Sequence, residues 1–350
     1  MKTPPARPLS LDDFDYALPP AQIAQTPPPR RSGARLLDVR GKSPRPRRFQ
    51  SLPGLLRAGD ILVFNDSKVI PARLQGAKES GGRAEIFAER FLPDGEVLAQ
   101  VRAAKPPRPG AVLNAAGRFV VQEKTADGFY RLRAETPNGA PVPARPRFLR
   151  RGITPLPPYI RRAPDENDKR RYQSVFARHP GSVAAPTASL HFDAAILQTL
   201  ARRGIETAKI TLHIGAGTFL PLRRGLQSRL HAERYRISAA AAGRINAAKK
   251  RGGRVIAAGT TVLRALESAA DNNGVCAAEA ETELFIKPGY CFRAADILLT
   301  NFHLPRSSLL VLACAFGGRR RVLAACCFAV QNKFRFYTYG DAMLLSRAAG

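Results

Sequence analysis

The apolar pattern of this chain changes twice, which restricts the fold to one domain interrupted by another. Between about residues 68 and 150, short alternating stretches such as GRAEIFAERFL and GEVLAQVRAA follow one another between Gly, Pro and Asp. The stretch RFVVQEKTADGFYRLRAE is typical of a hairpin that turns at Ala126-Asp127-Gly128. Successive short strands of this kind predict a small β-barrel or sandwich. We therefore predict an inserted β-barrel domain over residues 67–151.

On both sides of this insertion, strand-like runs alternate with helical periodicity. The runs GDILVFND, IETAKITLHI, RVIAAG, ETELFI and DILLTNF are typical of strands, and AAILQTLARR, AAAAGRINAAKKR and TTVLRALESAA of helices. Asp193 and Ser238 precede the first two helices as N-cap residues. Strand-helix alternation predicts an α/β fold, a mostly parallel sheet with helices on both faces. This domain takes residues 1–66 and 152–350.

The charge of the chain indicates a polyanionic partner. Its 56 Lys and Arg residues outnumber 27 Asp and Glu residues, for a formal net charge of +29. Nucleic acid fits best, because neutralising phosphates releases counterions; a general enrichment in Arg is the competing explanation. Arg131 and Arg133 alternate on one predicted strand and face either RNA or solvent.

Neither disulfides nor a membrane span are expected. The five cysteines include no C-x-x-C pair, which disfavours a disulfide framework and a zinc site. The opening MKTPPARPLS lacks the apolar core of a signal peptide, and GGRRR at 317–321 separates two apolar stretches. We expect a cytoplasmic protein.

One glycine turn suggests a ligand site. The stretch TLHIGAGTF, residues 211–219, ends a predicted strand with Gly215 and Gly217. A dinucleotide or ordinary methyltransferase site would continue into a helix, whereas Pro221 and Gly225 follow here. The turn therefore disfavours an ordinary Rossmann methyltransferase.

Polar side chains gather beside this turn and beside other predicted strand ends, where ligands bind in open α/β sheets. They are His213, His231 with Glu233, Asn301 with His303, and Thr187 with His191. His and Glu could hold a metal, but the His spacings match no H-x-x-x-H or similar pattern, so we expect no metal site.

Several stretches together resemble one family along almost the whole chain. They include FDYALPPAQIAQTPPPRRSGARLL, GDILVFNDSKVIPARL, YQSVFARHPGSVAAPTASLHFD, TLHIGAGTFLPL, HAERYRIS, VIAAGTTVLRALES, LTNFHLPRSSLLVLACAFGG and FRFYTYGDAM. The sequence resembles the S-adenosylmethionine:tRNA ribosyltransferase-isomerases of queuosine biosynthesis. Ser189 and Val262 stand where the family commonly has Gly and Ser, and Asp66 and Ser67 where it has Asn and Thr, which leaves local contacts open.

The resemblance implies an unusual use of S-adenosylmethionine. Its ribosyl group moves to 7-aminomethyl-7-deazaguanine at the wobble position of a tRNA with a GUN anticodon. Isomerisation gives epoxyqueuosine, and adenine and methionine leave. S-adenosylmethionine is thus a consumed substrate, no metal is needed, and tRNA explains the positive charge. The implied fold is an α/β domain with an inserted β-barrel.

The chemistry suggests roles for the polar residues. The sulfonium acidifies the adjacent ribose carbon, so a base is required. His213 or His303 is our candidate base, with Glu233 as alternative base or sulfonium partner. His231 and His191 are further catalytic candidates.

The remaining candidates bind substrate. Thr260, Thr261 and Arg264 suit the methionine carboxylate at a helix start, and Phe219 or Phe302 suits stacking on adenine. Thr187, Gly215, Gly217, Thr218 and Asn301 complete the set of binding residues that we predict.

Two other functions stay open from the sequence. One is an RNA methyltransferase that uses the same donor, and the other is a non-catalytic RNA-binding protein. The second leaves the clustered His, Glu and Thr residues unexplained. For each function we expect a monomer.

Overall fold

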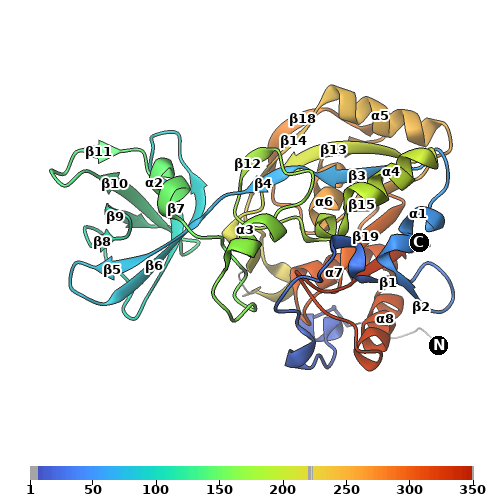
Figure 1. Ribbon diagram of the computed structural model, residues 1–350, viewed down its shortest axis with the longest axis horizontal. Coiled ribbons are helices and arrows are strands. Elements are labelled where there is room, and N and C mark those ends of the chain that lie inside the picture. Colours follow the sequence, from blue (N-terminus) through green and yellow to red (C-terminus); the bar gives the residue numbers. More distant parts are fainter. Residues whose placement is uncertain (1–6, 220–221, 223, 349–350) are drawn as a thin grey trace.

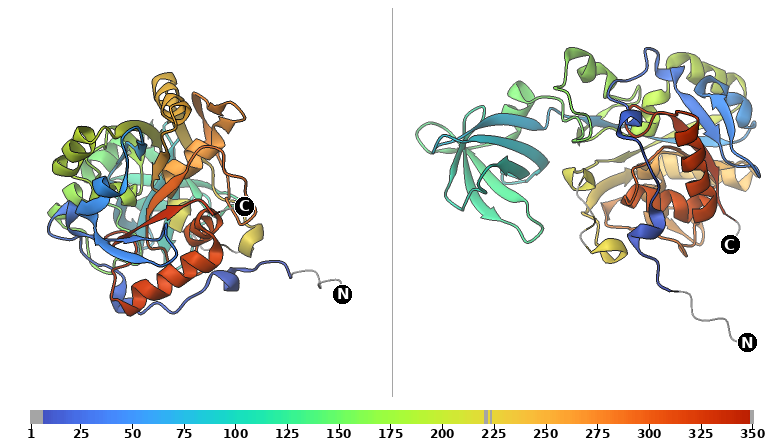
Figure 2. Two further views of the ribbon diagram at one scale, coloured as in Figure 1. Left: turned by 90° about the vertical axis from the view of Figure 1, so that its right-hand side faces the viewer. Right: turned by 90° about the horizontal axis from the view of Figure 1, so that it is seen from below.

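A nine-stranded mixed sheet forms the centre of the larger domain, and a β-barrel projects from one end of it (Figures 1 and 2). The computed structural model describes residues 7–219, 222 and 224–348. In spatial order the sheet contains β18 (Ala278–Thr282), β14 (Glu233–Ile237), β13 (Glu206–Leu212), β3 (Ile61–Asn65), β15 (Val255–Ala258), β19 (Ile297–Asn301), β20 (Ala342–Ser346), β1 (Arg35–Asp38) and β2 (Arg45–Arg48).

The prediction of a mostly parallel sheet holds only at its centre. β13, β3, β15 and β19 are mutually parallel, and β20 is parallel to β1. The other four pairings, β18–β14, β14–β13, β19–β20 and β1–β2, are antiparallel. Antiparallel neighbours need no crossover helix, so strands such as β2 join the sheet after a short turn that strand-helix alternation does not reveal.

Helices cover both faces of the sheet, as predicted. α5 (Ala239–Lys250), α6 (Thr260–Ser268), α7 (Ser308–Gly317) and α8 (Arg319–Gln331) pack on one face, and α1 (Leu52–Leu55) and α4 (Ala194–Arg202) on the other. The apolar run of strand β3 is unbroken because both faces of the strand are buried. Ile61 and Val63 belong to the core on one face, and Leu62 and Phe64 to the core on the other.

Both predicted N-caps are confirmed. Asp193 Oδ1 accepts the Ile196 N–H at 3.0 Å, and Ser238 Oγ accepts the Ala241 N–H at 3.2 Å. Shorter elements connect the large ones. They are α3 (Glu166–Arg171), the paired strands β4 (Ser67–Val69) and β12 (His179–Ser182), and the hairpin of β16 (Ala270–Asp271) and β17 (Gly274–Val275). The described residues also form the 3-10 helices η1 (Leu11–Phe14), η2 (Pro20–Gln22), η3 (Arg31–Gly33), η4 (Phe49–Ser51), η5 (Thr187–His191), η6 (Ala216–Phe219) and η7 (Gly225–Gln227).

The inserted domain is a closed barrel. Its ring runs β10 (Tyr130–Glu135), β7 (Val97–Ala103), β6 (Arg83–Phe91), β5 (Arg73–Lys78), β8 (Val112–Asn114) and β9 (Arg118–Lys124), and pairing of β9 with β10 closes it. The short β11 (Pro141–Val142) and α2 (Arg145–Arg151) complete the domain. The hairpin expected at residues 126–128 is confirmed between β9 and β10. The barrel sheet begins at Arg73, whereas residues 67–69 pair with β12.

The barrel core also includes a residue from the glycine turn. Ala216, in η6, is fully buried in the cluster formed by barrel residues such as Ile86 and Leu132. Strand β6 packs directly against η6. The glycine turn therefore lies at the junction of the two domains.

Candidate active site

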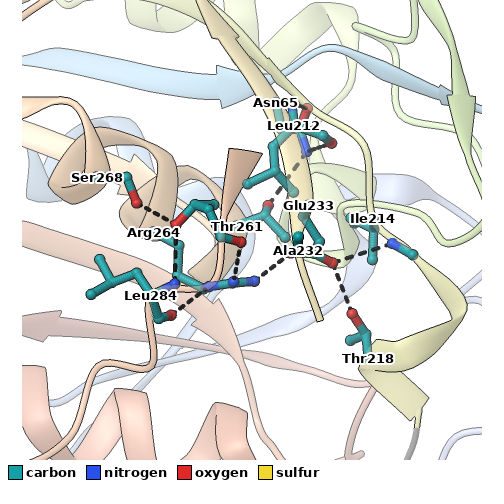
Figure 3. A network of polar contacts seen from close by, with 12 residues as sticks. Asn65, Leu212, Ile214, Thr218, Ala232, Glu233, Thr261, Arg264, Ser268 and Leu284 are labelled. Atoms are coloured by element: carbon teal, nitrogen blue, oxygen red, sulfur yellow. Dashed lines mark hydrogen bonds and ion pairs between the residues drawn. The ribbon is translucent and has the colours of Figure 1, made fainter. Parts of the chain in front are cut away.

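The glycine turn is held by one carboxylate of the neighbouring strand. After β13, the Gly215 N–H donates to Glu233 Oε1 at 3.2 Å, and the Thr218 hydroxyl donates to the same oxygen at 2.9 Å. Figure 3 shows both bonds converging on Glu233, the first residue of β14. Among the described residues the turn continues as the 3-10 helix η6, which ends at Phe219.

Arg264 of α6 pairs with the other oxygen of this carboxylate. Its Nη1 bonds Glu233 Oε2, its Nε donates to the Leu284 carbonyl at 3.0 Å, and its Nη2 donates to the Thr282 carbonyl at 3.4 Å (Figure 3). The guanidinium that the sequence suggests for the methionine carboxylate is thus already engaged. In the structure, Arg264 binds the Glu233 carboxylate and orients it.

A central cavity collects most of the predicted polar residues. We use this name for the hollow lined by the following predicted residues together with Tyr159, Tyr172, Tyr337 and their neighbours: Thr187, Thr218, Glu233, Thr260, Thr261, Arg264, Asn301 and His303. These eight side chains come from strand ends, helix starts and turns far apart in the sequence. Their convergence supports the prediction that strand ends of this sheet form the site.

Asn301 offers an unused acceptor to the central cavity. Its Nδ2 donates to the Tyr337 carbonyl at 2.9 Å, while its buried Oδ1 has no hydrogen-bond partner among the described residues. Tyr337 itself has φ = 72°, a conformation that is strained for a bulky residue. A buried acceptor and a strained backbone together are typical of a binding site.

His303 is an uncharged group in this cavity. Its Nε2 lies 2.9 Å from Thr300 Oγ1, and burial lowers the pKa of the imidazole to about 3. Near neutral pH the ring can exchange hydrogen bonds with a substrate, but it carries no charge.

Two other candidates lie outside the cavity lining, and the side chain of a third lies outside the described part of the chain. His191 is buried against Phe49, and its Nε2 lies 3.3 Å from Asn301 Nδ2. Burial lowers the pKa of this imidazole to about 4. Phe302 is fully buried in the core against Phe334 and Phe336, which removes it from the residues that could stack on adenine. Phe219 ends η6, but its side chain lies outside the described part of the chain.

Two hollows adjoin the central cavity at the domain junction. The interdomain cleft is lined by Gly215, Gly217, His231 and Glu233 from the large domain and by Glu89 and Asp127 from the barrel. A Cβ on Gly217 would lie 2.4 Å from His231 Cδ2, so only glycine allows this approach. The His231 ring also packs edge-on against Phe129 of the barrel at 5.1 Å.

His213 lies in the second hollow, the side groove, with Gly181, Arg145, Arg234 and Glu89. Burial lowers its pKa, and its Nδ1 has no partner among the described residues. The structure therefore separates His213 from His303, the two bases suggested by the sequence.

The residues that depart from the resembled family occupy ordinary places around the site. Asp66 Oδ1 accepts from the Thr211 hydroxyl at 2.6 Å, and the Ser67 N–H donates to Asn65 Oδ1 at 3.0 Å. Val262 is fully buried in the core, and Ser189 is buried with no partner for its hydroxyl among the described residues.

Glu89 is a site residue that sequence reasoning missed. It is 6% exposed on β6, and its Oε2 accepts the Gly217 N–H at 3.1 Å. Burial, followed by the nearby charge of Glu233, raises its pKa to about 7. The stretch AEIFAERFL carries Glu85, Glu89 and Arg90 among apolar residues, but this pattern does not reveal that the strand meets the glycine turn.

Two general features hold over the described ranges. No three His, Cys, Asp or Glu side chains there are placed to hold a metal ion. None of the helices in these ranges is long and apolar enough to cross a membrane.

Comparison with known proteins finds similarity along nearly the whole chain. Residues 11–345 match the family described as queuosine biosynthesis protein. An S-adenosylmethionine:tRNA ribosyltransferase-isomerase of Azoarcus sp. (strain BH72) is 50% identical, with 97% of this chain and 98% of the relative covered. The protein of the same description from Anaeromyxobacter dehalogenans is also 50% identical, with 97% and 100% covered. A crystal structure of S-adenosylmethionine tRNA ribosyltransferase from Thermotoga maritima matches with 30% identity and a TM-score of 0.53, covering 95% of this chain and 99% of that one.

Proposed function

The chain belongs to the queuosine biosynthesis protein family, and from this premise we propose that it is an S-adenosylmethionine:tRNA ribosyltransferase-isomerase. It moves the ribosyl group of S-adenosylmethionine to 7-aminomethyl-7-deazaguanine at the wobble position of a tRNA with a GUN anticodon. The group is isomerised to the epoxycyclopentane of epoxyqueuosine, and adenine and methionine are released.

The observation that carries this proposal is the convergence of eight predicted polar residues on one central cavity. Thr260 and Thr261 begin α6, where free N–H groups and the helix dipole suit the methionine carboxylate. The carboxylate of Glu233, oriented by Arg264, is an acidic group of the cavity lining and suits contact with a sulfonium. The free Oδ1 of Asn301 suits the exocyclic amine of adenine.

The reaction needs three proton-linked events that these groups can support. A base removes a proton from the ribose carbon next to the sulfonium, a donor assists the departure of adenine, and the acceptor amine attacks in its unprotonated form. His303 fits the second event best, because its buried neutral ring can only donate or accept a hydrogen bond. Glu233 fits the first, because its carboxylate lines the cavity in which we propose that S-adenosylmethionine binds.

The acceptor is a macromolecule, and the interdomain cleft is the opening through which it reaches the central cavity. The cleft and the cavity share Thr218, Glu233 and Arg264. The net charge of +29 supports binding of an RNA polyanion.

Product analysis tests this function. The protein is incubated with S-adenosylmethionine and tRNA that carries the aminomethyl-deazaguanine base, and adenine and the digested nucleosides are followed by chromatography with mass detection. Adenine together with an epoxycyclopentane adduct is the expected result. S-adenosylhomocysteine would indicate a methyltransferase instead, and tRNA binding without any product would indicate a binding protein.

A further inference from the structure

Two carboxylates from different domains hold the same glycine turn. The Gly215 N–H donates to Glu233 Oε1 at 3.2 Å, and the Gly217 N–H donates to Glu89 Oε2 at 3.1 Å. A Cβ on Gly215 would lie 2.1 Å from Glu89 Oε1, so glycine is needed there to let the barrel carboxylate approach. Both carboxylates line the interdomain cleft.

The barrel strand is built to direct Glu89 at this turn. In the pairing of β6 with β7, Ala88 lies opposite Ala99 and Arg90 lies opposite Leu98, so Glu89 is the extra residue of a β-bulge. Bulges change the direction of one side chain and are frequent beside active sites. Here the bulge turns an acidic side chain away from the barrel ladder and into the domain junction.

Glu89 differs from Glu233 in having no cation paired with it among the described residues. Glu233 is neutralised by Arg264, whereas the hydrogen bond that Glu89 accepts there comes from a backbone amide. Arg90, the adjacent residue of the same strand, is paired with Glu281 at 2.9 Å. A buried carboxylate without a counterion is costly, unless a cationic ligand supplies the missing charge.

The charged groups around Glu89 leave a place for such a ligand on the cleft side. The side groove is lined by Arg90, Arg145, Arg234 and His213, the cleft by Asp127, His231, Arg224, Arg229 and Arg264, and both hollows by Glu233. None of these cations forms an ion pair with Glu89 among the described residues, and Arg264 is already paired with Glu233. The acceptor enters through the cleft, so its positive group reaches Glu89 there and supplies the counterion that this carboxylate lacks.

We propose that Glu89 binds the primary aminomethyl group of the acceptor base as an ammonium ion and takes one proton from it. The step converts R–CH2–NH3+ and the Glu89 carboxylate into R–CH2–NH2 and a carboxylic acid. The nitrogen lone pair that is released forms the new N–C bond to the ribosyl group, and adenine and methionine leave with the electron pairs of the bonds that joined them to it. This inference rests on the proposed function and gives the barrel a catalytic residue.

The chemistry favours the ammonium over the other cation of this reaction, the sulfonium. A sulfonium has no N–H to donate, and its binding residues lie in the central cavity, which Glu89 does not line. The raised pKa of Glu89, about 7, also suits proton exchange near neutral pH.

Glu89→Gln is the decisive variant, because Gln keeps an oxygen for the Gly217 N–H but cannot take a proton. We expect kcat/KM for the acceptor tRNA to fall by at least about 10²-fold. The affinity for S-adenosylmethionine, measured by calorimetry, should stay within about threefold. The wild-type rise of kcat/KM with pH around 7 should disappear. Glu85→Gln, four residues earlier on β6, is the matched control and should keep wild-type kinetics.

A binding experiment with a neutral acceptor supplies a second readout. Wild-type protein should bind tRNA carrying the aminomethyl base more tightly than tRNA in which a nitrile replaces the aminomethyl group, and Glu89→Gln should lose this preference. An unchanged preference, an unchanged pH profile or wild-type turnover in Glu89→Gln would overturn the inference. A selective loss of S-adenosylmethionine affinity would overturn it too, and assign Glu89 to the sulfonium.

The two proposals fail in different ways. Absence of adenine release by the wild-type protein would refute the proposed function and this inference together. Adenine release by wild-type protein that equals that of Glu89→Gln would refute the inference alone.

Discussion

The carboxylate of Glu233 and the guanidinium of Arg264 form an ion pair that is closed to solvent, with 4% and 7% of their side chains exposed. Because both charges are buried, each depends on the other for neutralisation. Removing one leaves the other unpaired inside the protein, which is far more costly than losing an ion pair at the surface.

We therefore expect Glu233→Gln to lower the free energy of unfolding by about 3–5 kcal/mol, measured by denaturant titration. Glu279→Gln is the matched control, since Glu279 pairs with Arg236 on the adjacent strands with 79% and 61% of their side chains exposed. That control should change stability by at most about 1 kcal/mol. Equal effects of the two variants would contradict the role of burial.

Gly215 is predicted to tolerate no side chain. A Cβ there would lie 2.1 Å from Glu89 Oε1, so Gly215→Ala must push the barrel carboxylate away from the turn. We expect adenine release to fall at least about tenfold, the effect of a misplaced catalytic group. Gly243→Ala is the control: in α5 its Cβ meets nothing within 4 Å, and better helix propensity should raise stability by about 0.5–1 kcal/mol. Wild-type activity of Gly215→Ala would show that the two domains adjust freely.

Much of the larger domain could be predicted from its sequence. Unbroken apolar runs such as Ile61–Asn65 and the caps Asp193 and Ser238 are local signals, and local signals determine where strands and helices begin. The antiparallel edges of the sheet could not be predicted, because short linkers allow either pairing direction.

The site was predictable only where its residues follow strand ends. Asn301 and His303 fit that rule and do line the central cavity. Glu89 does not, because its role depends on a bulge and on the docking of a barrel strand against η6. Phe302 illustrates the opposite error: it follows a strand end, but its ring points into the core.

The two candidate histidine bases should now behave differently. His303 lines the central cavity with a pKa lowered to about 3, so His303→Ala should reduce turnover by about 10- to 100-fold equally at every pH from about 6 to 9, as expected for a lost hydrogen bond. His213 lies in the side groove, so His213→Ala should keep kcat within about threefold of wild type and raise KM for tRNA. Steady-state kinetics of both variants checks this, and a loss of kcat confined to His213→Ala would reverse the assignment.

Glu89 should also make folding stability depend on pH. Its pKa rises from about 4.5 in the unfolded chain to about 7 in the folded protein, so the folded state holds the proton more tightly. The stabilising contribution is therefore complete below about pH 4.5 and is lost as pH rises through about 7. Glu89→Gln resembles the protonated form, so by pH 8 it should be more stable than wild type by about 3 kcal/mol, with no advantage near pH 4.5. Denaturant titrations at both pH values measure this, and a difference that does not change with pH would show that Glu89 keeps its ordinary pKa.

Binding of tRNA should depend strongly on salt, and the side groove should account for part of that dependence. Each phosphate contact releases counterions, so the logarithm of the binding constant falls linearly with the logarithm of salt concentration. Arg145 is exposed at the start of α2 and lines the groove beside Glu89, so Arg145→Ala should reduce the slope by about one. Arg47, exposed on the edge strand β2 at the end of the sheet away from the barrel (Figure 1), is the control, and Arg47→Ala should leave the slope unchanged. Titrations of labelled tRNA at several salt concentrations give both slopes. A smaller slope for Arg47→Ala but not for Arg145→Ala would place the RNA backbone on β2 and away from the domain junction.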